Sequence, residues 1–479
     1  MKKRRLNILW IMAALFAFTG CNDFLDIQPV GKVMPKTAKE YRALLTDAYS
    51  RIPAERGKTT FRSDELTMEG ETNTTNLDSY LDIWRWNDTS PDETTLPFEW
   101  LQFYYVSYIA NSVIEQQYNI TEATDAERNQ LAGEAYMLRA YMHFILVNLY
   151  AEPYTHCDPK NTKGIPLKLD SDINKVLSRN TIAEVYTSIL SDIKEAERLL
   201  NVEEWPEGET YRFNTLSVPA FRARVYLYMG DWQQAYTNAT DVVGKHGELE
   251  DLTASSTLPN HYQSAEAILS MENIFNSSSL GAGYVASGLL SLYRSGDLRK
   301  SKFYKQLSAS ATEVLKAGVN TYRCTFRSAE FYLTAAEAAL ELNDMDNARH
   351  YLTELMKKRY LSAIYPTYEA EILSMTQDEL REEIYNERFR ELAFEGHRWF
   401  DLRRYKVAEK FPQATTINHV VENRVRNETT WTYETIWKRR FTLTPEDPAW
   451  VLPLPKVELD KNTGMIDNPR NERKGEDVE

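Results

Sequence analysis

Three glutamates late in the sequence have the spacing that brings carboxylates onto one face of a helix. Glu387, Glu391 and Glu395 lie four residues apart in a run, residues 376–405, that the pattern predicts to be one helix. Two such carboxylates could serve as acid and base in glycoside hydrolysis, if one of them held a proton at neutral pH. Surplus arginines keep carboxylates ionised, and this run also contains Arg388, Arg398 and Arg403. The spacing therefore predicts a salt-bridged helix end and not a catalytic acid.

The histidines and aspartates form no complete metal-binding pattern. None of the seven histidines has another histidine four residues away. The stretch Asp170-Ser171-Asp172-Ile173-Asn174 alternates oxygen ligands like a calcium loop, but Lys175 stands at the glycine position and Thr181 at the glutamate position. No phosphate-binding, nucleophile-elbow or dinucleotide fingerprint occurs. We expect no metal site and no cofactor.

The N-terminus has the pattern of a lipoprotein export signal. Four basic residues at positions 2–5 precede an apolar run, Leu6 to Phe18, which is too short to span a bilayer. The next residues are Thr19, Gly20 and Cys21, and with Phe18 they resemble the bacterial lipobox. A thiol is needed there because sulfur accepts the diacylglyceryl group. Cys21 is therefore predicted to be the lipidated first residue of the mature chain, and residues 1–20 its signal peptide; an ordinary signal peptide with an incidental cysteine is the alternative.

The composition limits the class of protein. The chain has 479 residues, 43% of them hydrophobic, so it can bury a large core. Its net charge is −14, and it becomes more acidic once the basic signal is removed, which makes nucleic acid an improbable partner. The three cysteines exclude a disulfide scaffold and form no zinc pattern.

Most of the remaining chain follows helical periodicity. Apolar residues predict helices over 99–117 and from Asp125 to about Tyr150, where Asp125 can cap free amides. Thr181 and Glu184 form a capping box that begins a helix running to Leu200.

Two segments repeat one helix-turn-helix pattern. Gly230 and Asn343 are residues that tolerate a left-handed helix end, and Asp231 and Asp344 can cap the helix that follows each. The pattern resembles a tetratricopeptide unit. Because the copies are far apart in sequence, a long insertion, residues 247–323, must leave the helical stack between them. That insertion and residues 59–97 have loop composition.

Several motifs in one order resemble the SusD/RagB family of surface lipoproteins over essentially the whole length. The resemblance rests on residues 21–26, 100–111, 133–140, 179–186, 327–333 and 387–404, together with the closing segments Val451-Leu452-Pro453-Leu454-Pro455 and Asn468-Pro469. The resemblance implies a mostly α-helical SusD-like fold with tetratricopeptide-like units and long loop insertions. It divides the chain into a lipidated cysteine and extended arm at 21–40, an N-terminal region at 41–246 and a C-terminal region at 247–479.

The resemblance also implies a function. Such proteins capture an oligosaccharide at the cell surface, without catalysis, and deliver it to a SusC-type TonB-dependent transporter in the outer membrane. Two alternatives stay open: a helical adaptor that binds only a partner protein, and a surface glycoside hydrolase. Which glycan or peptide is bound cannot be inferred from the sequence.

Aromatic side chains in the two loop segments are the candidate ligand contacts. Sugars offer apolar C–H faces and polar rims, so their sites combine flat aromatic rings with hydrogen-bonding groups. Each candidate ring could instead be packed inside the protein, and none is assigned by motif match. The candidates are Tyr80, Trp84, Trp86 and Tyr284.

Overall fold

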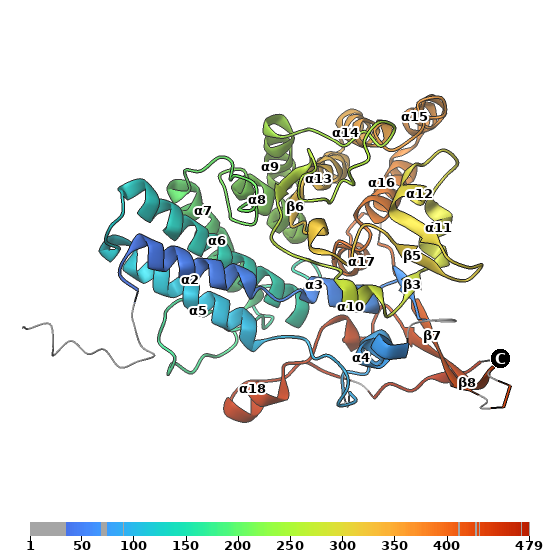
Figure 1. The fold of residues 1–479 in the computed structure, drawn as a ribbon, viewed down its shortest axis with the longest axis horizontal. Coiled ribbons are helices and arrows are strands. Elements are labelled where there is room, and N and C mark those ends of the chain that lie inside the picture. The colour runs from blue at the N-terminus through green and yellow to red at the C-terminus, as the bar shows by residue number, and fades with distance from the viewer. Residues whose placement is uncertain are drawn as a thin grey trace, which may run out of the picture.

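The computed structural model is mostly α-helical, as the sequence predicts (Figure 1). It describes residues 35–68, 74–89, 91–410, 412–426, 429–430, 432–470 and 472–478. Helices α2, α5, α6 and α7 occupy one end of the molecule, α11–α16 the other, and a β-hairpin extends below them. Among the described helices, none has both the length and the apolar character of a membrane span.

The N-terminal helices pack around α6. Their bounds are α2 Ala38–Ser50, α5 Leu101–Gln116, α6 Asp125–Tyr150 and α7 Ile182–Leu199. Thr181 and Glu184 form the expected capping box. For α6 the N-cap is Thr124, which forms a capping box with Glu127, so the expectation that Asp125 would cap this helix was wrong by one residue. From Gln130 onward nearly every residue of α6 is buried, because α5 and α7 pack on it.

The two predicted repeat units are present and stack on each other. They consist of α8 Ser217–Met229 with α9 Trp232–Lys245, and α13 Ser328–Glu341 with α14 Met345–Lys357. Gly230 and Asn343 take the left-handed conformation at φ 69° and 63°, as predicted. The carboxylates of Asp231 and Asp344 accept hydrogen bonds from the backbone amides of Gln234 and Asn347. These bonds cap the second helix of each unit. Helix α13 packs against α9, so the units are neighbours in space despite the insertion.

The predicted single helix over residues 376–405 is two helices. Helix α16 covers Gln377–Leu392 and α17 covers Arg398–Lys406. Between them Phe394 and Gly396 have φ 62° and 71°, which no α-helix accommodates. Glu395 therefore lies in a turn, not on the helix face that carries Glu387 and Glu391. Helix α15, Tyr365–Ser374, precedes this pair.

Both segments predicted to be loops contain regular structure, which corrects that prediction. Residues 59–97 include η2 Thr59–Arg62, β1 Leu66–Thr67 and α4 Thr74–Trp84, after α3 Glu55–Lys58. The 247–323 insertion contains β2 Ala267–Leu269, α10 Ser277–Leu280, β3 Tyr284–Val285, α11 Ser287–Leu292, α12 Arg299–Phe303, β4 Tyr304–Gln306, β5 Thr312–Val314 and η4 Asn320–Tyr322. These short strands pair antiparallel as β1–β3, β2–β6 and β4–β5, with β6 at Phe326–Arg327.

The C-terminal region adds a hairpin that the sequence reading did not predict. Strand β7, Ile417–Arg426, pairs antiparallel with β8, Tyr433–Leu443, from Ile417 opposite Leu443 onward. The remaining elements are η3 Gln117–Asn119, η5 Pro448–Trp450, α18 Lys456–Lys461 and β9 Glu476–Asp477, which extends this sheet beside β8.

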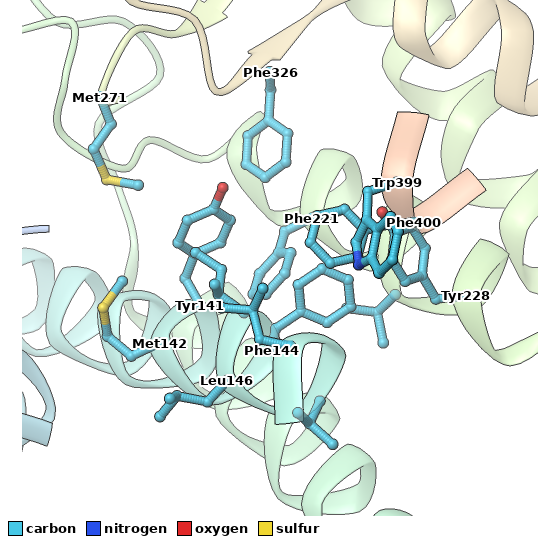
Figure 2. Close-up of a cluster of buried hydrophobic side chains, with 14 of the residues drawn as sticks. Tyr141, Met142, Phe144, Leu146, Phe221, Tyr228, Met271, Phe326, Trp399 and Phe400 are labelled. Atoms are coloured by element: carbon cyan, nitrogen blue, oxygen red, sulfur yellow. The ribbon is translucent and has the colours of Figure 1, made fainter. Parts of the chain in front are cut away.

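The larger hydrophobic core lies where α6 meets α8 and the C-terminal region (Figure 2). Phe221 packs on Tyr141 and Phe144 with ring centroids 5.3 and 5.4 Å apart, in edge-to-face geometry. A second core joins α13, α14 and α16. The two cores fix the helices that carry the polar residues described next.

Candidate functional site

The glutamates singled out in the sequence belong to a buried ionic network. Glu391 accepts hydrogen bonds from Arg299, Arg327 and Arg359 at 2.7–2.9 Å, and all four side chains are fully buried. In the buried part of the network, six carboxylates face five cations, and the partly exposed Arg294 extends it from Glu383 to Glu371 at the surface. The members are Asp297, Glu266, Glu383, Glu387, Glu391, Glu395, Arg299, Arg327, Arg359, Arg390 and Lys316.

The network keeps two of its carboxylates, Glu391 and Glu395, ionised. Burial alone would raise the pKa of Glu391, but the guanidinium groups of Arg359 and Arg327 outweigh it and hold that pKa well below its usual range. Burial likewise opposes Arg327 and Lys316 at Glu395, whose pKa is lowered. No proton is available on either group at neutral pH, in agreement with the predicted salt-bridged role. The arginines that bind these two glutamates come from distant segments, not from residues 388, 398 and 403 as the sequence suggested.

One cleft among the described residues has a volume of about 840 Å³. It lies between the connection from α7 to α8, the end of α9 and the first part of the insertion. Ser270 donates its amide to the Thr210 carbonyl at 3.0 Å, and the Asn214 side chain donates to the Ile268 carbonyl at 3.3 Å. These hydrogen bonds join the insertion to the α7–α8 connection and fix the cleft.

Most of the residues that line the cleft have polar side chains. Glu207 accepts hydrogen bonds from the Tyr262 hydroxyl at 3.2 Å and from the Gln263 amide at 2.6 Å. Loss of hydration and the Glu207 carboxylate raise the pKa of Tyr262, so its hydroxyl stays protonated. Other hydrogen-bonding and charged groups complete the lining: Glu203, Glu204, Thr210, Asn214, Thr215, Lys245, His246, Ser264 and Ser270.

Trp205 is the largest aromatic side chain of the cleft. The guanidinium groups of Arg212 and Arg42 lie 5.0 and 5.5 Å from its ring, and its indole N–H donates to the Phe213 carbonyl at 3.1 Å. The ring also lines a neighbouring cleft of about 510 Å³, so it separates the two hollows. Its orientation is therefore fixed before any ligand arrives.

Comparison with known proteins identifies the chain. A family model described as "SusD family" matches residues 288–470, and one described as "Starch-binding associating with outer membrane" matches residues 23–227. The chain belongs to the SusD/RagB family. Two SusD-like proteins of Formosa agariphila, P2 and P38, are 25% and 22% identical to it; they align with 86% and 83% of this chain and with 92% and 90% of their own lengths.

Solved structures of other SusD-type proteins have the same fold. A SusD superfamily protein from Bacteroides thetaiotaomicron covers 91% of this chain and 100% of its own, with a TM-score of 0.70 at 20% identity. A laminarin-binding SusD-like protein covers 91% and 99%, with a TM-score of 0.62 at 19% identity. These likenesses support the assignment of the mostly helical SusD-like architecture.

Three of the four predicted ligand aromatics of this SusD-family chain are inside the protein. Trp84 and Trp86 are 2% and 1% exposed, and their rings stack on His419 of β7 at centroid distances of 3.4 and 4.3 Å. Tyr80 stacks on Phe61 at 4.1 Å and is equally buried. Their faces are covered by other rings in this conformation. Packing inside the protein therefore describes these three rings better than a role as a stacking surface for sugar.

The other predicted site residues have separate locations. Tyr284 is half-buried on β3, opposite Thr67, and its contact with a ligand stays a prediction. None of the four aromatics lines the 840 Å³ cleft. Cys21 lies outside the described residues. In the calcium-like stretch, the Asp170 carboxylate forms ion pairs with Lys168 and Lys175 at 2.8 and 2.7 Å. Its oxygens therefore already have lysine partners. Cys157 and Cys324 are free thiols.

The sequence reading missed both aromatic residues of the cleft. Trp205 is followed by Pro206 and lies in an acidic stretch between two predicted helices, where a large aromatic residue stands out; in the structure it is half-buried. Tyr262 lies within the insertion, where no local pattern distinguishes it from the other tyrosines of that segment. Since the cleft joins segments about 55 residues apart, only the fold reveals it.

Proposed function

We propose that this chain captures a soluble oligosaccharide at the cell surface and passes it, chemically unchanged, to a TonB-dependent outer-membrane transporter. The observation that carries the proposal is the 840 Å³ cleft, where Trp205 and Tyr262 occur together with hydroxyl, amide and carboxylate groups. A hollow of this size accommodates a short saccharide. The laminarin-binding relative with the same fold supports a glycan as the ligand class.

The side chains of the cleft suit the chemistry of sugars. Aromatic edges and faces contact apolar C–H groups, while the carboxylate of Glu207 and the amide of Gln263 can bind hydroxyl groups. Because Tyr262 and Gln263 already hold Glu207, a saccharide would meet an ordered polar wall. Less side-chain entropy is then lost on binding than at a flexible surface.

The burial and pairing of the three glutamates noted in the sequence support binding without catalysis. Glu387, Glu391 and Glu395 bind arginine or lysine inside the protein and cannot reach a substrate. A surface hydrolase would need another acid and base pair. Release of reducing sugar from a bound oligosaccharide would contradict the non-catalytic proposal.

The binding test uses protein that begins at Asn22, titrated by calorimetry with soluble oligosaccharides, including laminarin fragments. Tyr262→Ala and Trp205→Ala should each weaken binding by about 1–3 kcal/mol, a range typical of truncated aromatic contacts. Tyr118→Ala is the matched control, because this exposed tyrosine does not line the cleft. Equal affinities for all three variants would remove the cleft from the proposal. An absence of glycan binding alongside a tight transporter complex would favour the adaptor.

Surface tethering is the second part of the proposal. We propose that Cys21 carries the lipid, since Phe18-Thr19-Gly20-Cys21 resembles a lipobox. Cys21→Ala should yield unlipidated protein that no longer partitions with membranes, whereas Cys157→Ala should leave the lipid in place. Mass spectrometry of the mature N-terminus and protease treatment of intact cells measure lipidation and surface exposure. An acylated mature chain in the Cys21→Ala variant would contradict the assignment.

A further inference from the structure

An edge of the molecule carries a concentration of exposed apolar side chains. Ile173 and Val176, in the 167–178 loop, have 79% and 78% of their surface in solvent. Leu101, Tyr105 and Tyr108 are exposed on α5 at helical spacing, and Val457 and Ile466 are exposed on and after α18. We call this surface the apolar edge; it runs along the side of the molecule where α5 and α18 lie (Figure 1).

Hydrogen bonds hold the parts of the apolar edge together. The side-chain amide of Asn111, on α5, donates to the backbone carbonyls of Lys168 and Asp170 at 3.1 and 2.8 Å. At the other side of the loop, the Asn462 amide, which follows α18, donates to the Leu177 carbonyl at 2.6 Å. Ile173 and Val176 therefore project from a loop that is fixed at both ends.

The 167–178 loop of the apolar edge is bound to Asn111 and Glu115 of α5, a few residues before Thr121, which pairs with the start of the described chain. Thr121 donates its amide to the Lys36 carbonyl at 2.8 Å, and Ala38 donates to the Thr121 carbonyl at 3.0 Å. Three residues before Thr121, Tyr118 is 81% exposed. Fourteen residues, 22–35, separate the proposed lipid anchor, Cys21, from Lys36. Even fully extended, they reach at most about 50 Å.

We infer that the apolar edge rests on the lipid surface, with Ile173 and Val176 inserted at the level of the headgroups. This inference builds on the proposed anchor at Cys21. A flexible tether alone would permit many orientations of the protein over the membrane. Apolar side chains that enter the interface would select one orientation, and tyrosines such as Tyr105 and Tyr108 favour that depth.

Charge and shape favour a lipid surface as the occupant. The chain has a net charge of −14, which repels anionic membranes, but in the 167–178 loop Lys168 and Lys175 balance Asp170 and Asp172. The loop itself therefore carries no net charge toward the lipid; outside it, the acidic side chain of Glu115 on α5 accepts a hydrogen bond from the Ser171 amide at 2.8 Å. Side chains with nearly four-fifths of their surface exposed project outward, as insertion between headgroups requires. Contact through apolar groups should also depend little on salt.

The test is sedimentation of the chain from Asn22 onward with phosphatidylcholine vesicles, so that no acyl chain contributes. We expect partitioning that persists in high salt and falls about tenfold when Ile173→Asp and Val176→Asp are combined. The matched control combines Leu307→Asp and Leu373→Asp, which alter exposed leucines far from this edge in sequence. The control should partition like the parent, and circular dichroism should be the same for all three proteins.

Two outcomes would overturn the inference. One is a parent chain that does not sediment with vesicles; the other is an Ile173/Val176 variant that sediments as well as the parent. If the variant instead loses only a complex with a transporter protein, the apolar edge is a protein interface. Oligosaccharide affinity, measured on the same variant, should stay unchanged, so a failure of glycan capture is distinguished from a failure of membrane contact. Acylation of Cys21 is measured separately.

Discussion

Glu391→Gln tests whether the buried ionic network holds the C-terminal half together. Oε1 of Glu391 accepts hydrogen bonds from Arg327 and Arg359, and Oε2 accepts from Arg299 and from a second nitrogen of Arg359. Glutamine preserves the shape but turns one oxygen into a donor facing two guanidinium N–H groups. Two charge-assisted hydrogen bonds are lost and three arginines lose an anion, which should cost about 3–5 kcal/mol.

The assay is denaturant unfolding combined with hydrogen exchange of the α16 amides. The matched control is Glu382→Gln, on the same helix but exposed, which should change stability by no more than about 0.5 kcal/mol. In Glu391→Gln, faster exchange should be concentrated in α16 and in β6, which carries Arg327. A loss of less than about 1 kcal/mol would refute the role given to this carboxylate.

The pH dependence gives an independent measure of the same group. Because the folded pKa of Glu391 lies well below the ordinary 4.5, its contribution is present above pH 4.5 and declines as the pH falls below that value. Glu391→Gln should therefore lose less stability than the parent between pH 4.5 and more acidic conditions. Parallel stability curves for the two proteins would contradict the lowered pKa.

Three further changes test the fold. Trp84→Ala should destabilise the protein by about 3–5 kcal/mol, since the ring is buried against His419; a normal melting temperature with weaker glycan binding would restore the platform interpretation. Gly230→Val should cost about 1 kcal/mol or more at φ 69°, whereas Gly244→Ala, with open space around its Cβ, should be tolerated, and equal melting temperatures would contradict the assigned turn. Burial lowers the pKa of His143 to about 3, so its contribution declines as pH falls below 6.5; His143→Phe should flatten the stability curve there, and an unchanged slope would contradict this.

Local signals predicted the helical part of the fold well. The capping box at Thr181 and the paired turns at Gly230 and Asn343 depend on residues three or four positions apart. Such signals are visible in the sequence and survive tertiary packing. The break at Phe394 was missed because a left-handed phenylalanine has no sequence signature; it is held where the Phe394 amide donates to the buried Glu65 at 2.6 Å.

The candidate site depended on contacts that sequence cannot supply. Trp84 and Trp86 stand near Pro and polar residues, which favoured an exposed loop, but β7 brings His419 between them from more than 330 residues away. The same limitation affected the glutamates. Their pairing with arginine followed from the composition of the segment, whereas the identity of the partners followed only from the fold.

The stacking of the two repeat units has a consequence for how such a protein can diversify. The Ser328 hydroxyl donates to the His246 carbonyl, and the Tyr332 hydroxyl donates to the Gly247 carbonyl, both at 2.8 Å. The two ends of the insertion therefore lie close together, and the helical stack holds them in place. Lengthening a loop between fixed ends costs little entropy. One wall of the cleft belongs to this insertion. Replacing the insertion would therefore change the ligand specificity of the cleft while the helical scaffold stays the same.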